Sequence, residues 1–302
     1  MKKLPFIQTS VFVDDRYQFS GNQLATFWNE EANKQLSNEE MQGIALEMNF
    51  SETTYIFSSK IDKCSAKVRI FTPGKELAFA GHPTLGTTYV LKEQNIVPVK
   101  TTKTFLELGI GPIEVEFIDK ETISMFQPRP SFLDEYSDGQ AIAEILYIEE
   151  SDISDEYPIQ AVSTGFPFLI VPLNSMDVIK SINLNAQKQI DILSKFITSE
   201  LLVFTKETTH EDSDVHVRMF APSAGVLEDP ATGSAAGPLG SYLEHWNVLD
   251  DHEKSTTIKV EQRFEINRPS KILVQPFYTK DEITQVKVSG KVRKIAESTF
   301  FL

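Results

Sequence analysis

Short apolar segments separated by turn residues recur along the whole chain. Segments of this length, rich in β-branched and aromatic residues, predict strands, and the turn residues between them predict where the strands end. The predicted strands are 4–13, 53–57, 67–71, 104–108, 113–118, 122–127, 168–171, 201–205, 215–220, 257–262, 271–277, 283–288 and 291–296. So many short strands with few helices indicate α+β barrels or rolls.

The helical spacing of apolar residues is clearest between Ser37 and Met48. Ser37 and Glu40 predict a capping box at the start of this helix. Its apolar stripe consists of Met41, Ile44, Ala45 and Met48. Shorter helices are predicted at 138–148 and 186–196, and the Pro-Arg-Pro sequence at 128–130 interrupts any regular element.

One sequence pattern occurs twice. VRIFTP at 68–73 recurs as VRMFAP at 217–222, with four of six residues identical and 149 positions between the two starts (217 minus 68). Each copy leads through a short loop to a segment of small residues around a proline, at 81–86 and at 229–234. A strand, a loop and a helix start repeated at half the chain length predict two related domains.

The helix predicted after each copy carries no charge. Residues 83–91 and 230–243 contain no Asp, Glu, Lys or Arg. Because a surface helix needs a polar face, both helices are expected to be buried on every side, with a sheet curled around each. Pro83 and Pro230 are predicted at the first helical position, where the missing N–H costs nothing. Pro238 is expected to kink the second helix or to mark its end.

Composition narrows the function classes. The 302 residues fit two domains of about 150 residues each. The formal net charge of −14 repels phosphate backbones and anionic membranes, so nucleic acid is excluded as a partner. No uncharged apolar run approaches 18 residues, and the apolar N-terminal segment is broken by Gln8, Thr9 and Ser10, so neither a membrane span nor a signal peptide is expected.

The single cysteine, Cys64, excludes an internal disulfide framework and a cysteine metal cluster. It fits a reducing compartment, and we expect a cytoplasmic enzyme or binding protein. The chain has no GxGxxG, Walker A, HExxH or GxSxG motif, so no dinucleotide, ATP or metal is indicated. Four histidines lack metal-ligand spacing and are interpreted as surface or strand residues without partners: His210, His216, His245 and His252.

Two ionisable residues occupy matching places in the repeat. His82 precedes Pro83, and Asp229 precedes Pro230. The start of a buried helix presents unpaired N–H groups and a partial positive charge, so two such starts facing one site would bind a carboxylate. The alternatives are that Asp229 is an ordinary N-cap and that His82 makes a structural hydrogen bond. The pairing of the two residues favours a site.

Glu52 lies between a helix end and a predicted strand. A carboxyl beside such a strand is partly desolvated, and desolvation raises a carboxyl pKa toward the range useful for general acid–base catalysis. Taken alone, the pattern favours the alternative, a solvated loop glutamate, because glutamate is mostly exposed.

Several stretches together resemble one known family. They are 11–12 with 19–25, 51–54, 69–73, 81–84, 218–222, 228–237 and, more weakly, 268–270. Their order and spacing over nearly the whole chain resemble the PhzF-like family of phenazine biosynthesis proteins, which has the diaminopimelate epimerase-like fold. The strongest of them is EDPATGSAAG at 228–237.

The resemblance implies two pseudo-symmetric α+β domains, each a β-barrel or roll wrapped around a central helix, with the active site between them. It places residues 1–127 and 286–302 in the first domain and 128–285 in the second. It further implies a homodimer that binds a small carboxylate substrate and uses no cofactor and no metal.

The resemblance also assigns roles to individual residues. The acid/base glutamate of the family corresponds to Glu52, and its partners correspond to His82 and Asp229. The carboxylate-binding pair at a helix start corresponds to Gly233 and Ser234. Three further residues in the matching stretches are expected to bind substrate: Asn22, Ser51 and Gly81.

Two positions depart from the family pattern. Gln262–Arg263 stands where members often have Gln-Gly, and Pro238 replaces a small helix former. The implied activity is a cofactor-independent isomerase that moves a proton within a small carboxylate-bearing substrate by general acid/base catalysis, a phenazine precursor being one possible substrate. Two alternatives remain open: an amino-acid racemase or epimerase, with His82 or Asp229 as second base, and a non-catalytic binding or scaffold protein on the same fold.

Overall fold

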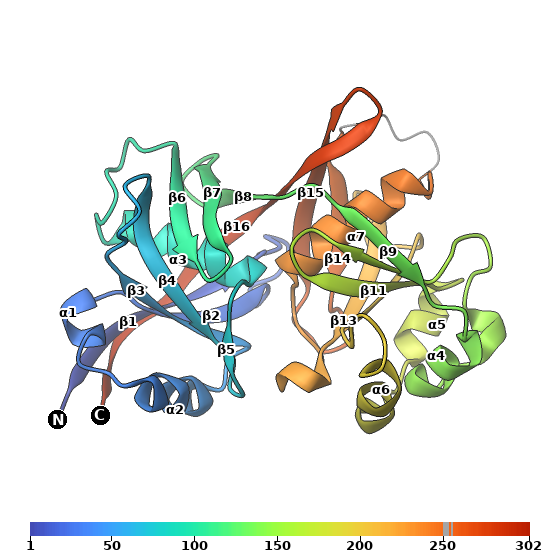
Figure 1. Ribbon diagram of the computed structural model, residues 1–302, viewed down its shortest axis with the longest axis horizontal. Helices are drawn as coiled ribbons and strands as arrows, with labels where there is room; N and C mark the ends of the chain where they lie inside the picture. Colours follow the sequence, from blue (N-terminus) through green and yellow to red (C-terminus); the bar gives the residue numbers. More distant parts are fainter. Residues whose placement is uncertain (250–253, 255) are drawn as a thin grey trace. The chain divides into compact units, whose positions relative to one another are not determined.

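The computed structural model describes residues 1–249, 254 and 256–302 (Figure 1). The chain forms two compact units, residues 1–126 with 289–302 and residues 127–288. His252, interpreted above as a surface or strand residue, lies outside the described residues. In the described part of the chain, no helix has both the length and the apolar character that a bilayer span requires.

The first unit is a closed barrel around helix α3 (Gly81–Glu93). Its strands follow in the order β1 (Lys3–Val11), β2 (Asn22–Phe27), β3 (Glu52–Phe57), β4 (Cys64–Phe71), β6 (Lys103–Leu108), β7 (Gly111–Phe117), β8 (Thr122–Gln127) and β16 (Glu282–Phe301). Pairing of β16 with β1 closes the barrel, and β5 (Glu76–Leu77) pairs with β4. Helices α1 (Glu30–Asn33) and α2 (Asn38–Met48) lie on the strands, and α2 packs against an aromatic cluster that contains Phe27, Tyr55 and Phe71.

The second unit surrounds helix α7 (Gly233–His245) with strands. Their order is β9 (Ser131–Glu135), β10 (Gln160–Ser163), β11 (Pro167–Pro172), β12 (Leu201–Thr205), β13 (Val215–Phe220), β14 (Ile258–Gln262), β15 (Ser270–Thr279) and β16. Helices α4 (Gly139–Leu146), α5 (Met176–Ser181) and α6 (Ala186–Leu193) share a second apolar cluster with β11, β12 and β13. Two short 3-10 helices lie at Glu150–Asp152 and Pro222–Ala224.

The strand pairings repeat between the two units. In the first, β1–β2 is antiparallel, β2–β3 parallel, β3–β4 antiparallel and β4–β6 parallel. In the second, β10–β11, β11–β12, β12–β13 and β13–β14 follow the same sequence of directions. The two VR-F motifs lie in β4 and β13, and α3 and α7 form the parallel crossovers that follow them. The pseudo-symmetric α+β fold expected from the repeat is therefore confirmed.

Both central helices are buried nearly throughout, as their lack of charge predicts. Glycine is required where the sheet approaches most closely. A Cβ on Gly86 would lie 2.5 Å from the Leu24 side chain, and a Cβ on Gly237 would lie 1.9 Å from Gln127 Oε1. Because atoms do not approach this closely, these glycines allow each sheet to wrap tightly around its helix.

The predicted helix starts are wrong in detail. Helix α3 begins at Gly81, so Pro83 is its third residue, and α7 begins at Gly233, three residues after Pro230. Pro83 remains harmless, because the first four N–H groups of a helix have no intrahelical partner. Pro238 does not end α7, which continues to His245. The N–H that Pro238 lacks would have bonded a carbonyl in the first turn of the helix.

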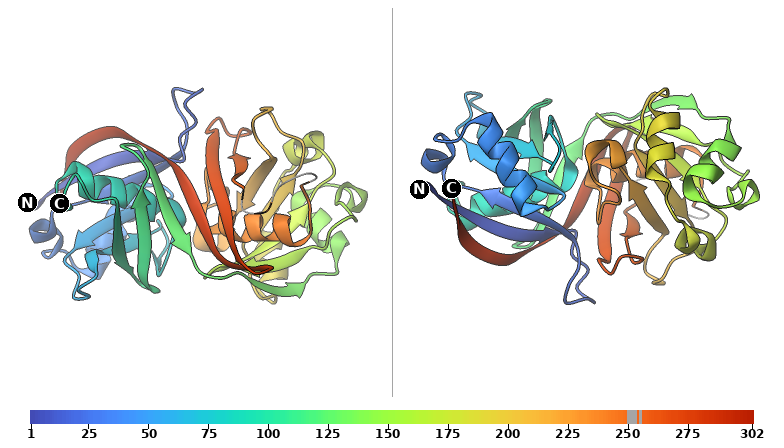
Figure 2. Two further views of the ribbon diagram at one scale, coloured as in Figure 1. Left: turned by 90° about the horizontal axis from the view of Figure 1, so that it is seen from above. Right: turned by 90° about the horizontal axis from the view of Figure 1, so that it is seen from below.

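The two strands predicted at 283–288 and 291–296 form one continuous strand of 20 residues, β16 (Figure 2, red). The Ser289–Gly290 pair reads as a turn in sequence, but it lies within β16, which is hydrogen-bonded to β8 in the sheet, and the Ser289 hydroxyl lies 2.8 Å from that of Ser124 in β8. Strands β2 and β9 are not recognisable from periodicity, and Asn22 is the first residue of β2.

Candidate active site

The alternation of β3 directs Glu52 toward the helix inside the first barrel. Thr54 lies two residues further on the same strand face, and its hydroxyl is 2.9 Å from that of Thr87 in α3. Glu52, the first residue of the strand, therefore also faces the interior and is 9% exposed. The interpretation of Glu52 as a solvated loop residue is wrong, because the strand begins one residue earlier than predicted.

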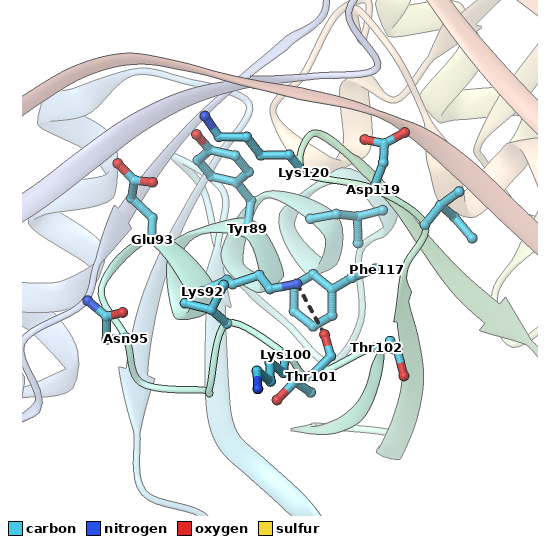
Figure 3. A pocket seen from close by; sticks show the side chains of 13 residues that line it. Tyr89, Lys92, Glu93, Asn95, Lys100, Thr101, Thr102, Phe117, Asp119 and Lys120 are labelled. Atoms are coloured by element: carbon cyan, nitrogen blue, oxygen red, sulfur yellow. Dashed lines mark hydrogen bonds between the residues drawn. The ribbon is translucent and has the colours of Figure 1, made fainter.

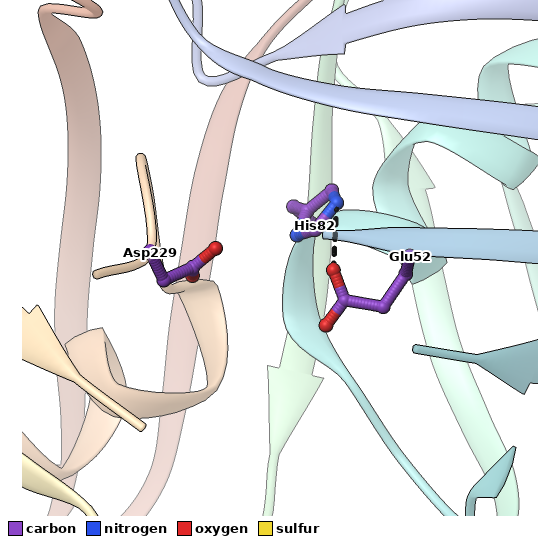
Figure 4. Close-up of side chains that lie close together, drawn as sticks. All are labelled: Glu52, His82 and Asp229. Carbon is purple, nitrogen blue, oxygen red and sulfur yellow. Dashed lines mark ion pairs between the residues drawn. The ribbon is translucent and has the colours of Figure 1, made fainter. Parts of the chain in front are cut away.

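His82 faces Glu52 from the first turn of α3. His82 Nε2 lies 3.3 Å from Glu52 Oε2 (Figure 4), although the two atoms lack the alignment of a hydrogen bond. The Asn22 amide nitrogen lies 3.0 Å from His82 Nδ1. Since an amide nitrogen only donates, Nδ1 is the acceptor in this contact, which leaves the imidazole proton on Nε2, the nitrogen that lies nearest to the Glu52 carboxyl group.

Burial sets the charge of this histidine. It lowers the pKa of His82 to about 3, and a hydrogen bond with the backbone of Gln23 opposes the shift only in part. The contact with Glu52 therefore joins a neutral imidazole to a carboxyl group. A buried carboxyl next to a neutral N–H donor can accept a proton from a substrate and return it.

The start of α3 supplies a polar environment for this pair. Its N-cap residue, Ala80, provides no side-chain hydrogen bond, so the first N–H groups of the helix are not capped by a side chain. Gly81 is the first, buried residue of the helix, and Ser51 lies half-buried directly before Glu52. The partial positive charge of the helix start favours negative charge beside it.

In the second unit, a tight turn precedes α7. The Asp229 N–H donates to the Met219 carbonyl at 3.0 Å, which joins the turn to β13. The Thr232 hydroxyl donates to Asp229 Oδ2 at 2.5 Å, and the Thr232 N–H donates to Gln262 Oε1 at 3.0 Å. Thr232, not Asp229, is the N-cap residue, so the N-cap interpretation of Asp229 is wrong. The turn holds a buried carboxylate in a fixed orientation.

The same turn leaves the start of α7 without a side-chain cap. The Thr232 hydroxyl is engaged with Asp229, and no side chain caps the helix. Gly233 and Ser234 are its first two residues, whose N–H groups have no intrahelical acceptor. Gln127 Nε2 donates to the Gly233 carbonyl at 2.8 Å and fixes this end of the helix. An uncapped helix start held in this way is suited to an anion.

Two features of the second unit escape sequence reasoning. Gln262 binds the turn from β14, and the only signal for it is its place in the unusual Gln262–Arg263 pair. His216 is buried between two carboxylates, with Nδ1 2.8 Å from Glu261 and Nε2 2.8 Å from Glu265. The interpretation of His216 as a residue without partners is therefore wrong.

A separate hollow of about 540 Å³ lies at the other end of α3 (Figure 3). Lys92 crosses it, with Nζ 4.1 Å from the centre of the Phe117 ring and 3.1 Å from the Thr101 carbonyl. Its lining contains neither Glu52 nor His82. This hollow therefore contributes nothing to the chemistry of that pair.

Comparison with known proteins places these residues in context. The family model described as Phenazine biosynthesis-like protein (PhzC-PhzF) matches residues 10–297. The chain is 33% identical to an uncharacterized isomerase of Clostridium acetobutylicum, over 100% of this chain and 99% of that protein. It is 32% identical to the trans-2,3-dihydro-3-hydroxyanthranilate isomerase of Pseudomonas aeruginosa, over 93% of this chain and 94% of that enzyme.

Solved structures of similar proteins have the same fold. A PhzF-family phenazine biosynthesis protein of Bacillus anthracis is 27% identical, with a TM-score of 0.89 and full coverage of both chains. A probable proline racemase of Agrobacterium radiobacter, 9% identical with a TM-score of 0.69 over 99% of this chain and 93% of that one, shares the fold alone.

Proposed function

The chain belongs to the phenazine biosynthesis-like protein family and is an isomerase, and from this premise we propose that it moves a proton within a small carboxylate-bearing substrate, without a cofactor. The observation that carries the proposal is the buried contact of Glu52 Oε2 with His82 Nε2 at 3.3 Å. It supplies a proton acceptor in a desolvated position with a neutral N–H donor beside it.

In the proposed reaction, Glu52 removes a proton from a carbon atom of the substrate. The electron pair of the broken C–H bond moves into the conjugated system of the substrate, and Glu52 then returns the proton to a different carbon. His82 keeps its own proton and orients the carboxyl group of Glu52, while Asn22 fixes the tautomer of His82. General acid–base groups of this kind contribute about 10²–10⁴-fold to a rate.

We assign the binding of the substrate carboxylate to the start of α7. The Gly233 and Ser234 N–H groups would donate to the carboxylate and stabilise the charge that develops in an enolate-like transition state. One donor of this type is worth about 3 kcal/mol. Asp229, held by Thr232, would orient and exchange protons with a polar group of the substrate. Ser51 and Gly81 remain proposed substrate-binding residues.

Deuterium exchange tests the proposal. The protein is incubated in D2O with unsaturated cyclic carboxylic acids, first trans-2,3-dihydro-3-hydroxyanthranilate because a relative is named for it, and label is followed by NMR. We expect deuterium at the carbon that receives the proton. Glu52→Gln, which keeps the shape of the side chain, should lower turnover by about 10²–10⁴-fold while binding persists.

The matched control is Glu47→Gln, an exposed glutamate on α2, which should leave turnover unchanged. Near-normal turnover of Glu52→Gln would place the base elsewhere. Label at one stereocentre with loss of its chirality, without a shifted double bond, would instead support a racemase or epimerase. Neither label nor a shifted double bond in any acid of the panel would favour a binding protein.

A further inference from the structure

Arg263, directly after β14, holds a backbone conformation that its side chain does not favour. Its φ is +62°, in the left-handed region where a Cβ crowds the following carbonyl. Glycine adopts this region freely, because it has no Cβ. The N–H of Arg263 makes a long contact of 3.4 Å with the Val217 carbonyl. Strained backbone conformations cluster at functional sites, so an arginine at a position suited to glycine indicates that its side chain has a function.

The guanidinium group of Arg263 is poorly satisfied. The residue is half-buried, but its Nε is fully buried and has no hydrogen-bond partner among the described residues. Burial lowers the pKa of Arg263, and the carboxylates of Asp229 and Glu228 oppose this shift. Glu228 is already bound in bidentate fashion to Arg218, at 2.8 and 3.0 Å. Because buried donor groups are normally hydrogen-bonded, the Nε–H of Arg263 is available to a ligand.

The position of Arg263 relates it to the turn before α7. The preceding residue, Gln262, binds the Asp229 carbonyl at 2.8 Å and the Thr232 N–H at 3.0 Å. Two residues later, Glu265 binds the buried His216 and anchors the loop. The arginine is therefore carried on a loop that is fixed on both sides, next to the turn assigned to substrate binding. A fixed arginine loses less conformational entropy when it binds an anion.

Resting on the proposed function, we propose that Arg263 is a specificity-determining residue that binds a second carboxylate of the substrate, so that the substrate class is a dicarboxylate. The planar guanidinium fork matches a carboxylate in bidentate geometry.

Binding measurements test this without requiring turnover. Dicarboxylic acids of four to six carbons are each compared with their monomethyl esters by calorimetric titration of the wild-type protein, Arg263→Gly and Arg263→Lys. The wild type should prefer the diacid by about tenfold or more, the effect of a charge-assisted hydrogen bond. Arg263→Gly should lose the preference, and Arg263→Lys should retain part of it. An undiminished preference in Arg263→Gly, or none in the wild type, overturns the proposal.

Thermal unfolding separates this role from a structural one. Without ligand, Arg263→Gly should be at least as stable as the wild type, because it relieves a left-handed arginine and removes a buried N–H donor that lacks a partner. A clear loss of stability would show that the guanidinium supports the fold and would overturn the proposal. If diacids bind through Arg263 but no carboxylate is isomerised, the proposed reaction fails while this assignment stands. If monoacids are isomerised and diacids bind no more tightly than their monomethyl esters, the proposed reaction stands and the assignment of Arg263 fails.

Discussion

The side-chain amide of Gln262 donates a hydrogen bond to the backbone carbonyl of Asp229 at 2.8 Å, while its oxygen accepts one from the Thr232 N–H at 3.0 Å. Gln262 thus replaces, with one side chain, the two backbone partners that the buried turn before α7 lacks. A buried turn without such partners would be costly. The geometry of the proposed carboxylate site at the start of α7 therefore depends on Gln262, a residue of strand β14.

Gln262→Leu should weaken both stability and catalysis. Leaving the buried Thr232 N–H and Asp229 carbonyl unpaired should lower the free energy of unfolding by about 1–3 kcal/mol per group. A displacement of the turn by about 1 Å should lower kcat by about 10²-fold. Chemical denaturation and steady-state kinetics measure the two effects. The control is Gln187→Leu on the exposed face of α6. Full activity in Gln262→Leu would mean that the turn keeps its shape without the amide.

His82 should not titrate in the physiological range. Burial lowers its pKa to about 3, well below the ordinary value near 6.5, so its ring proton shifts should stay constant from pH 8 to pH 5. Histidine ring NMR measures this directly. A His82 midpoint near 6.5 would show that burial does not keep the imidazole neutral and would contradict its proposed role as a neutral N–H donor.

The buried His216 cluster should make stability depend on pH. Burial by itself lowers the pKa of His216, but hydrogen bonds to Glu261 and Glu265 outweigh it and the pKa is raised. Burial raises the pKa of each glutamate, but the bonds to His216 prevail and both pKa values are lowered. The histidine contribution is thus complete below the unfolded pKa near 6.5 and is lost as pH rises through the folded value. The glutamate contributions are complete above about 4.5 and are lost as pH falls.

The cluster should therefore stabilise most between about pH 5 and 6.5. His216→Gln should lower the free energy of unfolding by about 3 kcal/mol at pH 6 and by less at pH 9. Urea unfolding at the two pH values measures the difference, with His245→Gln on the exposed end of α7 as control. An equal loss at both pH values would show that the imidazole keeps the same charge at pH 6 and pH 9.

Two glycine substitutions should act in opposite directions. Gly237→Ala places a Cβ 1.9 Å from Gln127 Oε1, so the cost of displacing Gln127, about 1–3 kcal/mol or more, exceeds the gain in helix propensity of about 1 kcal/mol. Gly43→Ala, in α2, meets nothing within 4 Å and should stabilise by about 1 kcal/mol. Thermal unfolding compares the two. Equal effects would mean that α7 is free to shift within its sheet.

Local signals predicted much of the fold. The Ser37–Glu40 capping box is present as predicted, and the two uncharged segments are indeed the buried central helices. Both follow from neighbours in sequence, or from a polarity requirement that any surface helix must meet. The start of α7 was missed because side chains from elsewhere in the fold, above all Gln262, close the turn after Pro230.

Contacts between residues far apart in the sequence could not be predicted. Glu261 and Glu265 lie 45 and 49 positions from His216, so no spacing rule connects them. The left-handed backbone of Arg263 was invisible for a similar reason, because arginine does not signal a positive φ. For Glu52 and His82, the pattern alone did not connect the two residues, and the resemblance to a family grouped them as proposed catalytic partners.

The long strand β16 has a consequence for synthesis of the protein on the ribosome. The final residues 289–302 belong to the first unit, where nine positions of β1 pair with the far end of β16. The N-terminal barrel therefore exposes the open edges of β1 and β8 until residues 289–302 have left the ribosome. An unpaired edge is a template for association with other chains. Emergence of residues 289–302, rather than of residue 126, is the event that ends this exposure.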